Sequence, residues 1–174
     1  ITVIWADIDP ETGTLCPESA RNKLTNKTKA IFHNHFCGYP GYVDEINEIG
    51  KEKGLFIVDD AIEAFGSEYK NRKIGNTGSD ATVFSFQTVR LPNTIDGGAI
   101  SFKDSDHFEK AKRIRDYGID RGVFRDNLGE ISIDSDISEP GFGVLLSEIN
   151  SYIGCQQMEK LPGLLETQRK NAEA

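Results

Sequence analysis

Short β-rich runs alternate with helical periods along most of the chain, and this alternation restricts the fold more than any other feature. Residues 55–58 form a continuous apolar run, which is typical of a strand buried on both faces of a parallel sheet. Just before it, Val43, Ile46 and Ile49 are spaced to share one face of a helix, and Gly54 follows as a stop signal. The pattern predicts an α/β domain.

The same periodicities give the expected elements. Strands are expected over residues 1–8, 30–36, 55–58, 81–86 and 98–102, and helices over residues 17–24, 43–49, 104–117, 144–158 and 161–174. We expect Pro162-Gly163 to separate the last two helices. Gly, Lys and Asn are frequent over residues 66–78, which predicts a hairpin-like stretch. Residues 120–140 carry many charges and little periodicity, which predicts a long functional loop or lid.

The charge balance restricts the class of partner. Acidic residues outnumber basic ones by 28 to 20, so the formal net charge is −8 and the isoelectric point is about 4.9. A nucleic-acid binder needs a basic face to neutralise phosphates, so no nucleic-acid partner is expected. Small phosphorylated ligands are still compatible with this charge, because helix N-termini and backbone amides can hold them.

The cysteines and the apolar runs bear on the cellular setting. Cys16, Cys37 and Cys155 are too few and too scattered for a disulfide framework, so a reduced, cytoplasmic setting is the simplest interpretation. The apolar runs are too short to span a membrane, and no signal peptide is recognised. The chain lacks an initiator Met and opens on a strand-like run, so we expect it to be a piece of a longer protein.

Two carboxylates, Asp59 and Asp60, follow the apolar run at residues 55–58. The carboxyl ends of strands are where open α/β sheets bind ligands. One carboxylate there can pair with a cationic ring nitrogen, and two could hold a metal ion. The competing interpretation is that the acidic residues cap the start of the next helix. The segment alone leaves these alternatives open.

Two further patterns are weaker. A strand ends at Ser85, and the Gly97-Gly98 pair that follows lets the backbone come close to another group, although most such pairs are turns. His33 and His35 alternate along a strand with Cys37, so the three could share a face as metal ligands. Packing inside a buried strand is the favoured interpretation of these residues, and we predict no metal site.

Taken together and in this order, the segments resemble the DegT/StrS family of sugar aminotransferases that depend on pyridoxal phosphate (PLP). The resemblance is carried by residues 7–12, 28–31, 35–40, 59–70, 84–86, 96–99 and 113–118, and it covers nearly the whole chain. It implies the large domain of a fold-type I PLP-dependent transferase, with a mixed, mainly parallel sheet flanked by helices. Residues 1–160 are expected in that PLP-binding domain, and residues 161–174 are expected to begin the connection to a small C-terminal domain.

The resemblance also implies roles for individual residues. Asp60 matches the aspartate that pairs with the pyridinium nitrogen of PLP and so keeps the ring an electron sink. Ser85 matches the serine that binds the cofactor phosphate. Arg90 stands where the family has the lysine that forms the Schiff base, and Glu63 stands where it usually has a glutamine near the phenolic oxygen. The partners implied are a nucleotide-linked keto sugar, glutamate as amino donor, and a second copy of the chain in a homodimer.

Four positions depart from the family pattern: Arg90, Glu63, Gly143 and Leu145. A guanidinium stays protonated and cannot form the imine, so Arg90 predicts lost or impaired transamination. The family's Gly-Phe-Asn-x-Arg pattern has Gly143 in place of Asn and Leu145 in place of Arg. Since the changes at Arg90 and Glu63 are complementary in charge, we predict an ion pair between them that occupies part of the cofactor site.

Several functions are compatible with these departures. The chain could bind PLP or its aminated form noncovalently, as sugar dehydratases of this family do with a histidine in place of the lysine. It could instead be a catalytically inactive member that serves as a structural or regulatory partner, or a remnant that keeps only the fold. A metal-dependent nucleotide-binding domain built on Asp59 and Asp60 ranks last, because no phosphate-binding Gly-rich loop follows the first strand.

Overall fold

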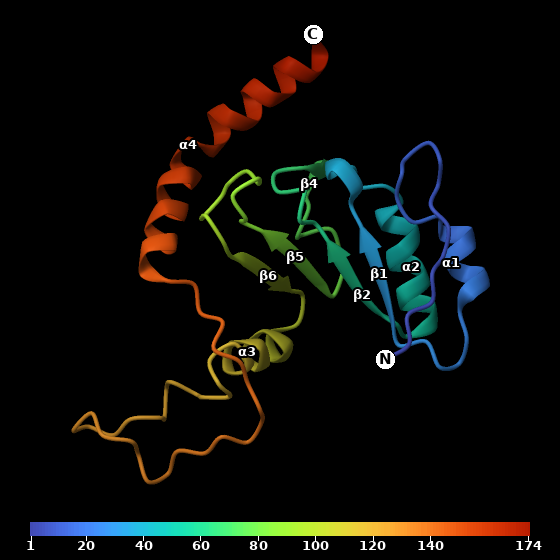
Figure 1. Cartoon of the computed structure of the whole chain (residues 1–174). Coiled ribbons are helices and arrows are strands. Elements are labelled where there is room, and N and C mark those ends of the chain that lie inside the picture. Colours follow the sequence, from blue (N-terminus) through green and yellow to red (C-terminus); the bar gives the residue numbers. More distant parts are fainter. The chain divides into compact units, whose positions relative to one another are not determined.

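The computed structural model describes residues 1–174, and the chain divides into two compact units, residues 1–103 with 148–174 and residues 104–147. The first unit is built on a four-stranded sheet in the order β1-β2-β5-β6 (Figure 1). Its strands are β1 (Ala30–Asn34), β2 (Phe56–Asp60), β5 (Ala81–Ser85) and β6 (Gly98–Phe102). The first three run parallel and β6 runs antiparallel to β5, so the sheet is mixed and mainly parallel, as predicted.

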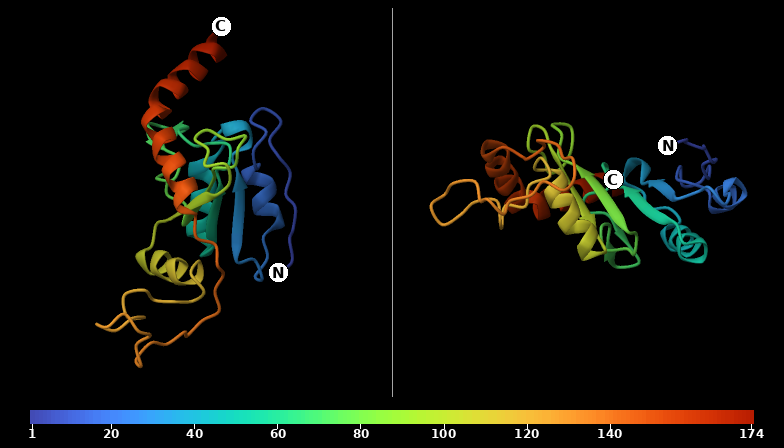
Figure 2. Two further views of the ribbon diagram at one scale, coloured as in Figure 1. Left: turned by 60° about the vertical axis from the view of Figure 1, so that its left-hand side comes forward. Right: turned by 90° about the horizontal axis from the view of Figure 1, so that it is seen from below.

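The first unit has six other elements. They are α1 (Pro17–Lys23), the 3-10 turn η1 (Phe36–Gly38), α2 (Val43–Lys53), the hairpin strands β3 (Glu68–Tyr69) and β4 (Arg72–Lys73), and α4 (Glu148–Glu173). Helix α2 packs against β1 and β2, with α1 beside it (Figures 1 and 2). It ends at Gly54, whose φ of 63° is the left-handed conformation that the stop signal predicted.

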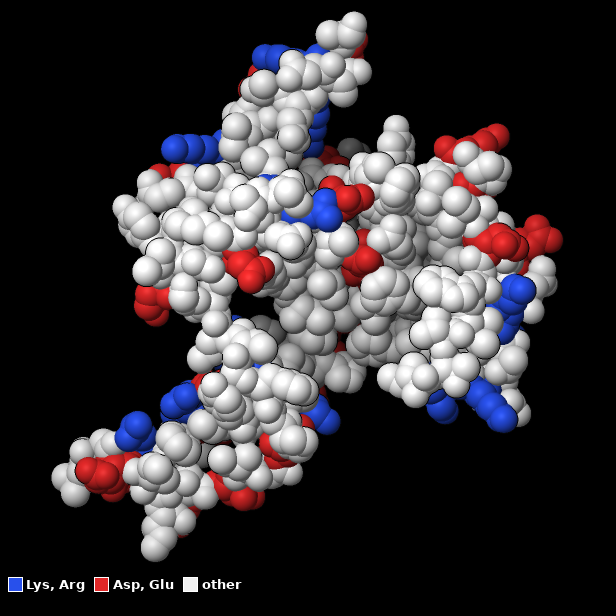
Figure 3. Space-filling view, in the orientation of Figure 1, with Lys and Arg blue, Asp and Glu red and all other residues white.

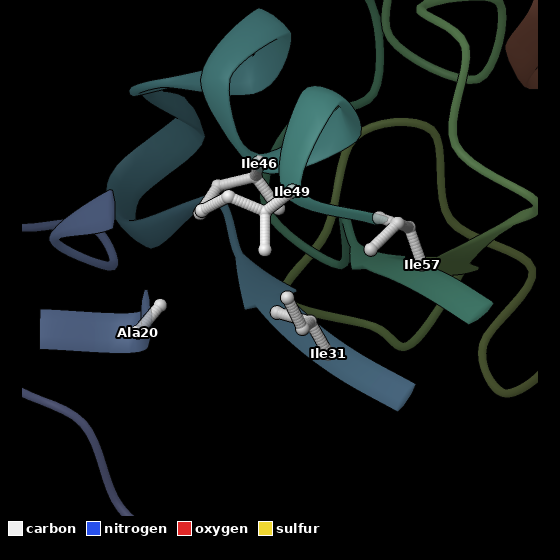
Figure 4. Close-up of a cluster of buried hydrophobic side chains, with 5 residues drawn as sticks. All are labelled: Ala20, Ile31, Ile46, Ile49 and Ile57. Carbon is white, nitrogen blue, oxygen red and sulfur yellow. The ribbon is translucent and has the colours of Figure 1, made fainter. Parts of the chain in front are cut away.

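The core of the first unit lies between α2 and the first two strands. Ile46 and Ile49 of α2 are completely buried, and Figure 4 shows them directed toward Ile31 of β1, with Ile57 of β2 close by. Ala20 of α1 completes the cluster. The helical spacing of the isoleucines in α2 therefore serves to bury one helix face against the sheet.

A second cluster of buried apolar side chains supports the segment after β2. It consists of Ala61, Ala64, Ile74 and Phe84, and Phe65 packs edge-on against Phe84 with ring centroids 5.2 Å apart. These contacts fix the turn that carries Glu63, because Ala61 before it and Ala64 after it are fully buried.

The sheet face opposite α2 is open. Strand register places Phe32, Val58, Val83 and Ile100 on this face, since paired residues point to the same side. Phe32 is 63% exposed and Ile100 46% exposed, so this face of the sheet is only partly covered. On the side of this unit seen in Figure 3, uncharged side chains predominate and charged ones are scattered.

One expected strand and two expected helices differ from the structure. No strand forms over residues 1–8, where only Ile8 makes an isolated bridge to Leu15, because no neighbouring strand is present to pair with this run. The two helices expected around Pro162 are a single helix, α4, with Pro162 inside it. Proline removes only one backbone hydrogen bond, so the helix bends along its length instead of ending (Figures 1 and 2).

The second unit contains one helix and a long irregular segment. Helix α3 (Ser105–Ile114) is capped by Asp104, whose carboxylate accepts hydrogen bonds from the amides of Asp106 and His107. Residues 120–140 contain no helix or strand, in agreement with the predicted loop, and its functional role stays a prediction. Across both units, none of the helices combines the length and the apolar character that a membrane span requires.

Candidate functional site

Asp60 and Ser85 lie at the same edge of the sheet. Asp60 is the last residue of β2 and Ser85 the last of β5, and the two strands are parallel neighbours with Asp60 paired to Val83. Asp60 lies two residues after Val58, and Ser85 lies two residues after Val83. Both side chains therefore point to the open face of the sheet. The structure thus brings together two of the residues that the sequence singled out, at the edge where open α/β sheets bind ligands.

The carboxylate of Asp60 is held from two sides. Asn34 of β1 donates a hydrogen bond from Nδ2 to Asp60 Oδ2 at 2.8 Å, and the amide of Ile62 donates to Oδ1 at 3.4 Å. Asp59 points to the opposite, buried face, as alternation along a strand requires. The two adjacent carboxylates therefore cannot hold one metal ion, and Asp60 keeps a fixed orientation suited to a cationic partner.

The predicted ion pair between Arg90 and Glu63 is present. Arg90 Nη1 donates to Glu63 Oε1 at 2.7 Å, and the amide of Cys37 donates to Oε2 at 2.9 Å. The hydrogen bond from Arg90, followed by the one from Cys37, lowers the pKa of Glu63 below its ordinary value of 4.5. Arg90 Nε is buried and has no hydrogen-bond partner. One donor of the guanidinium is thus left unused beside the pair.

The turn after β5 positions Arg90. The amide of Phe86 donates to Gly97 O, the amide of Thr94 donates to Phe86 O, and the amide of Arg90 donates to Gln87 O. A Cβ at Gly98 would lie 2.6 Å from Phe84 O, so the close pairing of β5 with β6 requires glycine there. The second glycine of the Gly97-Gly98 pair therefore allows β5 and β6 to pair closely at the base of this turn.

The hydroxyl of Ser85 has capacity for a ligand. Its oxygen accepts a hydrogen bond from the amide of Gln87 at 3.3 Å. A serine hydroxyl also carries one donor hydrogen, which can be directed to an oxygen such as that of a phosphate. Ser85 is half-buried at the strand end, so this donor is accessible from the open face.

In the second unit, the structure accounts for the glycine at position 143. A Cβ on Gly143 would overlap the hydroxyl of Tyr117, and the amide of Tyr117 donates to Phe142 O. Tyr117 adopts a φ of 58°, which directs its ring over this position. An asparagine here would displace the tyrosine. Leu145, the other departure in this segment, is 51% exposed.

Comparison with known proteins identifies the family of the chain. The sequence profile of the DegT/DnrJ/EryC1/StrS aminotransferase family matches residues 1–174. The chain belongs to this family. An uncharacterized protein of Methanocaldococcus jannaschii is 35% identical over 170 residues, which cover 98% of this chain and 43% of that protein.

Two solved structures of family enzymes share the fold. The sugar aminotransferase CalS13 from Micromonospora echinospora superimposes with a TM-score of 0.88 at 27% identity, covering 97% of this chain and 46% of that one. The E. coli GDP-4-keto-6-deoxy-D-mannose-3-dehydratase with bound hydrated PLP superimposes with a TM-score of 0.82 at 29% identity, covering 97% and 45%. The fold is therefore that of the fold-type I aminotransferases, and the chain spans less than half the length of these relatives.

Sequence reasoning missed two contributors to the site. Asn34 orients Asp60, and the amide of Cys37 binds Glu63. The signal for Asn34 is its pairing with Asp60 across β1 and β2, which follows only once the strand register is known. The amide of Cys37 carries no sequence signal, because any residue in the turn after β1 supplies a backbone N–H.

Proposed function

We propose that this chain forms the cofactor-facing part of a PLP-dependent sugar enzyme, and that it binds PLP or its aminated form without a covalent link. The observation that carries the proposal is the 2.7 Å ion pair between Arg90 and Glu63 at the lysine position. A protonated guanidinium that is held by a carboxylate supplies neither a nucleophile nor a proton acceptor. Transamination through a lysine at this position is therefore lost in this chain.

The residues at the edge of the sheet fit the noncovalent part of PLP binding. Asp60 presents a carboxylate that Asn34 already orients, which suits a protonated ring nitrogen. Ser85 presents a hydroxyl donor, which suits the phosphate. When bound, PLP supplies an electron sink for charge that develops on the substrate carbon. Arg90 does not fit covalent attachment.

The ion pair also makes Glu63 compatible with an anionic cofactor. An unpaired carboxylate would repel a phenolate oxygen and would favour its own protonation. Arg90 neutralises this charge, and its unused Nε–H offers a donor beside the pair. We infer that Arg90 and Glu63 act together as a neutral wall of the cofactor site, where the family's lysine and glutamine would stand.

The substrate class and the assembly are proposed from the family resemblance. The neighbours include a sugar aminotransferase and a dehydratase of a nucleotide-linked keto sugar, so we propose a nucleotide-linked keto sugar as the substrate. Glutamate as amino donor and a homodimer are proposed on the same resemblance. Residues 1–160 would belong to the PLP-binding domain, and residues 161–174 would begin the connection to a small C-terminal domain.

A dehydratase is the second candidate, since one neighbour carries hydrated PLP, a form that has no imine to the protein. In this chain, no histidine stands at position 90. His33 and His35 are buried on the sheet face away from Asp60. Proton transfer on the open face would therefore need a group other than these two imidazoles. An inactive partner of an active enzyme is the alternative in which no PLP binds.

The decisive experiment adds PLP to the chain and follows its visible absorbance, then treats the complex with borohydride and measures the protein mass. The wild-type chain should change the PLP spectrum without a borohydride-fixed mass increase on residue 90. Arg90→Lys combined with Glu63→Gln should gain that mass increase, because it restores the family's residue pair. A spectrum unchanged by the wild-type chain and by the double variant would contradict PLP binding.

Asp60→Asn separates cofactor binding from covalent chemistry. This variant keeps the shape of the side chain but removes the carboxylate that would pair with the ring nitrogen. We expect at least tenfold weaker PLP binding by absorbance titration. Glu68→Gln, on an exposed side chain of the β3–β4 hairpin, provides the matched control and should leave the affinity unchanged. Equal affinities of Asp60→Asn and the control would remove Asp60 from the site.

A further inference from the structure

Two imidazoles and one carboxylate converge on the buried side of the sheet, away from Asp60. His33 of β1 pairs in register with Asp59 of β2, so their side chains share this face. His35 lies two residues after His33 and completes the group. The three residues are each at most 1% exposed. The group has no role in the proposed PLP chemistry.

Both imidazoles approach the same carboxylate oxygen. His33 Nδ1 and His35 Nε2 each lie 3.4 Å from Asp59 Oδ1. A tetrahedral zinc ion with bonds of about 2.0–2.1 Å places neighbouring ligand atoms about 3.3–3.4 Å apart. The two observed separations therefore equal the edge of such a tetrahedron. The possible ligand atoms of the group all lie within 4.8 Å of one another, so one ligand atom of each residue is within reach of a single ion.

The hydrogen bond of His35 fixes which of its nitrogens carries the proton. His35 Nδ1 lies 3.1 Å from Pro40 O, and a carbonyl oxygen only accepts, so Nδ1 is the donor. In the neutral ring, Nε2 then presents a lone pair toward the Asp59 carboxylate. Two acceptors that face each other in a buried site require a proton or a metal ion between them. An imidazole whose Nδ1–H binds a backbone carbonyl is the usual arrangement of a metal-bound histidine.

A proton on His35 Nε2 would leave His33 without a hydrogen-bond partner. Neither nitrogen of His33 has a hydrogen-bond partner, and His35 Nε2 has none either, although all three atoms are buried. Buried polar atoms of native proteins are normally hydrogen-bonded, so the two nitrogens that lie 3.4 Å from Asp59 Oδ1 without a hydrogen bond indicate a ligand. The other oxygen of Asp59 is already oriented by the hydroxyl of Thr77 at 3.5 Å.

We propose that His33 Nδ1, His35 Nε2 and Asp59 Oδ1 bind one divalent transition-metal ion of the zinc type. Nitrogen and carboxylate ligands suit zinc and its neighbours in the first transition row. Pro40 O and the Thr77 hydroxyl hold His35 and Asp59 in place from behind. The fourth position is left to a water or to the second oxygen of Asp59. The ion would join β1 to β2 on the opposite face from Asp60.

The test uses the full chain after removal of metals by a chelator. Zn²⁺ is titrated by calorimetry, and Co²⁺ is titrated by visible absorbance, which reports a tetrahedral site directly. We expect one equivalent of Zn²⁺ per chain, a higher melting temperature with Zn²⁺ present, and at least tenfold weaker binding by His33→Gln. The absence of stoichiometric binding of both ions would overturn the proposal.

Two controls separate this group from other metal ligands of the chain. His107→Gln alters an imidazole that also lies near a carboxylate, Asp104, but is exposed, and Cys37→Ser removes an exposed thiol. Both variants should bind Zn²⁺ like the wild type. Binding that survives in His33→Gln and disappears in Cys37→Ser would assign the ion to the thiol instead. If His33→Gln does not fold, X-ray absorption spectroscopy of the zinc-loaded wild type still distinguishes nitrogen and oxygen ligands from a sulfur ligand.

Discussion

Arg90 Nη1 lies 2.7 Å from Glu63 Oε1, and this pair joins the turn after β5 to the turn after β2. Arg90 alone would leave a cation without a partner at its position, and Glu63 alone would leave a carboxylate without one. Together the two side chains neutralise each other. The two departures from the family pattern are therefore one structural change in the proposed cofactor site.

The stability supplied by this pair should depend on pH. Because its folded-state pKa is lowered below 4.5, Glu63 contributes stability that is present above pH 4.5 and is lost as the pH falls through its folded pKa. Glu63→Gln should lower the free energy of unfolding at pH 7 by about 0.5–1 kcal/mol, since the pair is partly exposed. Urea unfolding of both chains at pH 7 and well below pH 4.5 checks this. A difference that is as large in acid as at pH 7 would contradict the assignment.

A network around Asp44 should hold the β3–β4 hairpin against α2. Lys70 Nζ and Arg72 Nη2 each donate to Asp44 at 2.7 Å, and Tyr69 Oη donates at 3.2 Å. Hydrogen bonds from Lys70 and then Arg72 lower the pKa of Asp44 below its ordinary value of 3.8. Asp44→Asn should speed hydrogen exchange of the hairpin amides severalfold at pH 7. Glu45→Gln in the same helix is the control, and equal exchange in the two variants would contradict this role.

The isoleucines of α2 should dominate the stability of the first unit. Ile46 is fully buried, so Ile46→Ala removes apolar contacts and leaves a cavity. We expect it to lower the free energy of unfolding by about 2–5 kcal/mol, and Ile46→Val by about 0.5–1.5 kcal/mol. Ile4→Ala, at a side chain 65% exposed, should change it by less than about 0.5 kcal/mol. Denaturant unfolding measures all three, and similar losses for Ile46→Ala and Ile4→Ala would argue against this core.

Position 143 should tolerate the family's asparagine only if Tyr117 changes. Gly143→Asn places a side chain on the Tyr117 hydroxyl, so the segment around both residues must rearrange. We expect faster limited proteolysis of residues 115–144 in this variant. Adding Tyr117→Gly should restore much of the protection, because glycine readily adopts the φ of 58° found there. Identical cleavage of the single and double variants would show that the two positions are independent.

The sequence alone predicts the elements whose pattern is local. Residues 55–58 are continuously apolar, and Val43, Ile46 and Ile49 have helical spacing, so β2 and α2 follow directly. The ion pair between Arg90 and Glu63 was predictable because the family resemblance places both positions at one site.

Features that depend on tertiary contacts were not predictable in this way. Residues 1–8 have strand-like composition, but a strand also needs a partner, and composition does not report one. The convergence of His33 and His35 on Asp59 depends on the register between β1 and β2, which no single segment encodes. Pro162 predicts a helix break from the sequence. In the structure Leu161 is 7% exposed, and its packing supports a continuous α4.

The open face of the sheet has a practical consequence for handling this chain. Phe32 and Ile100 expose an apolar surface, and β1 and β6 are both edge strands with backbone groups available for pairing. Concentrated solutions should therefore self-associate through added β-strand contacts, and dyes that fluoresce on apolar surfaces should bind. The net charge of −8 opposes this association at low ionic strength, so salt that screens the repulsion should promote precipitation.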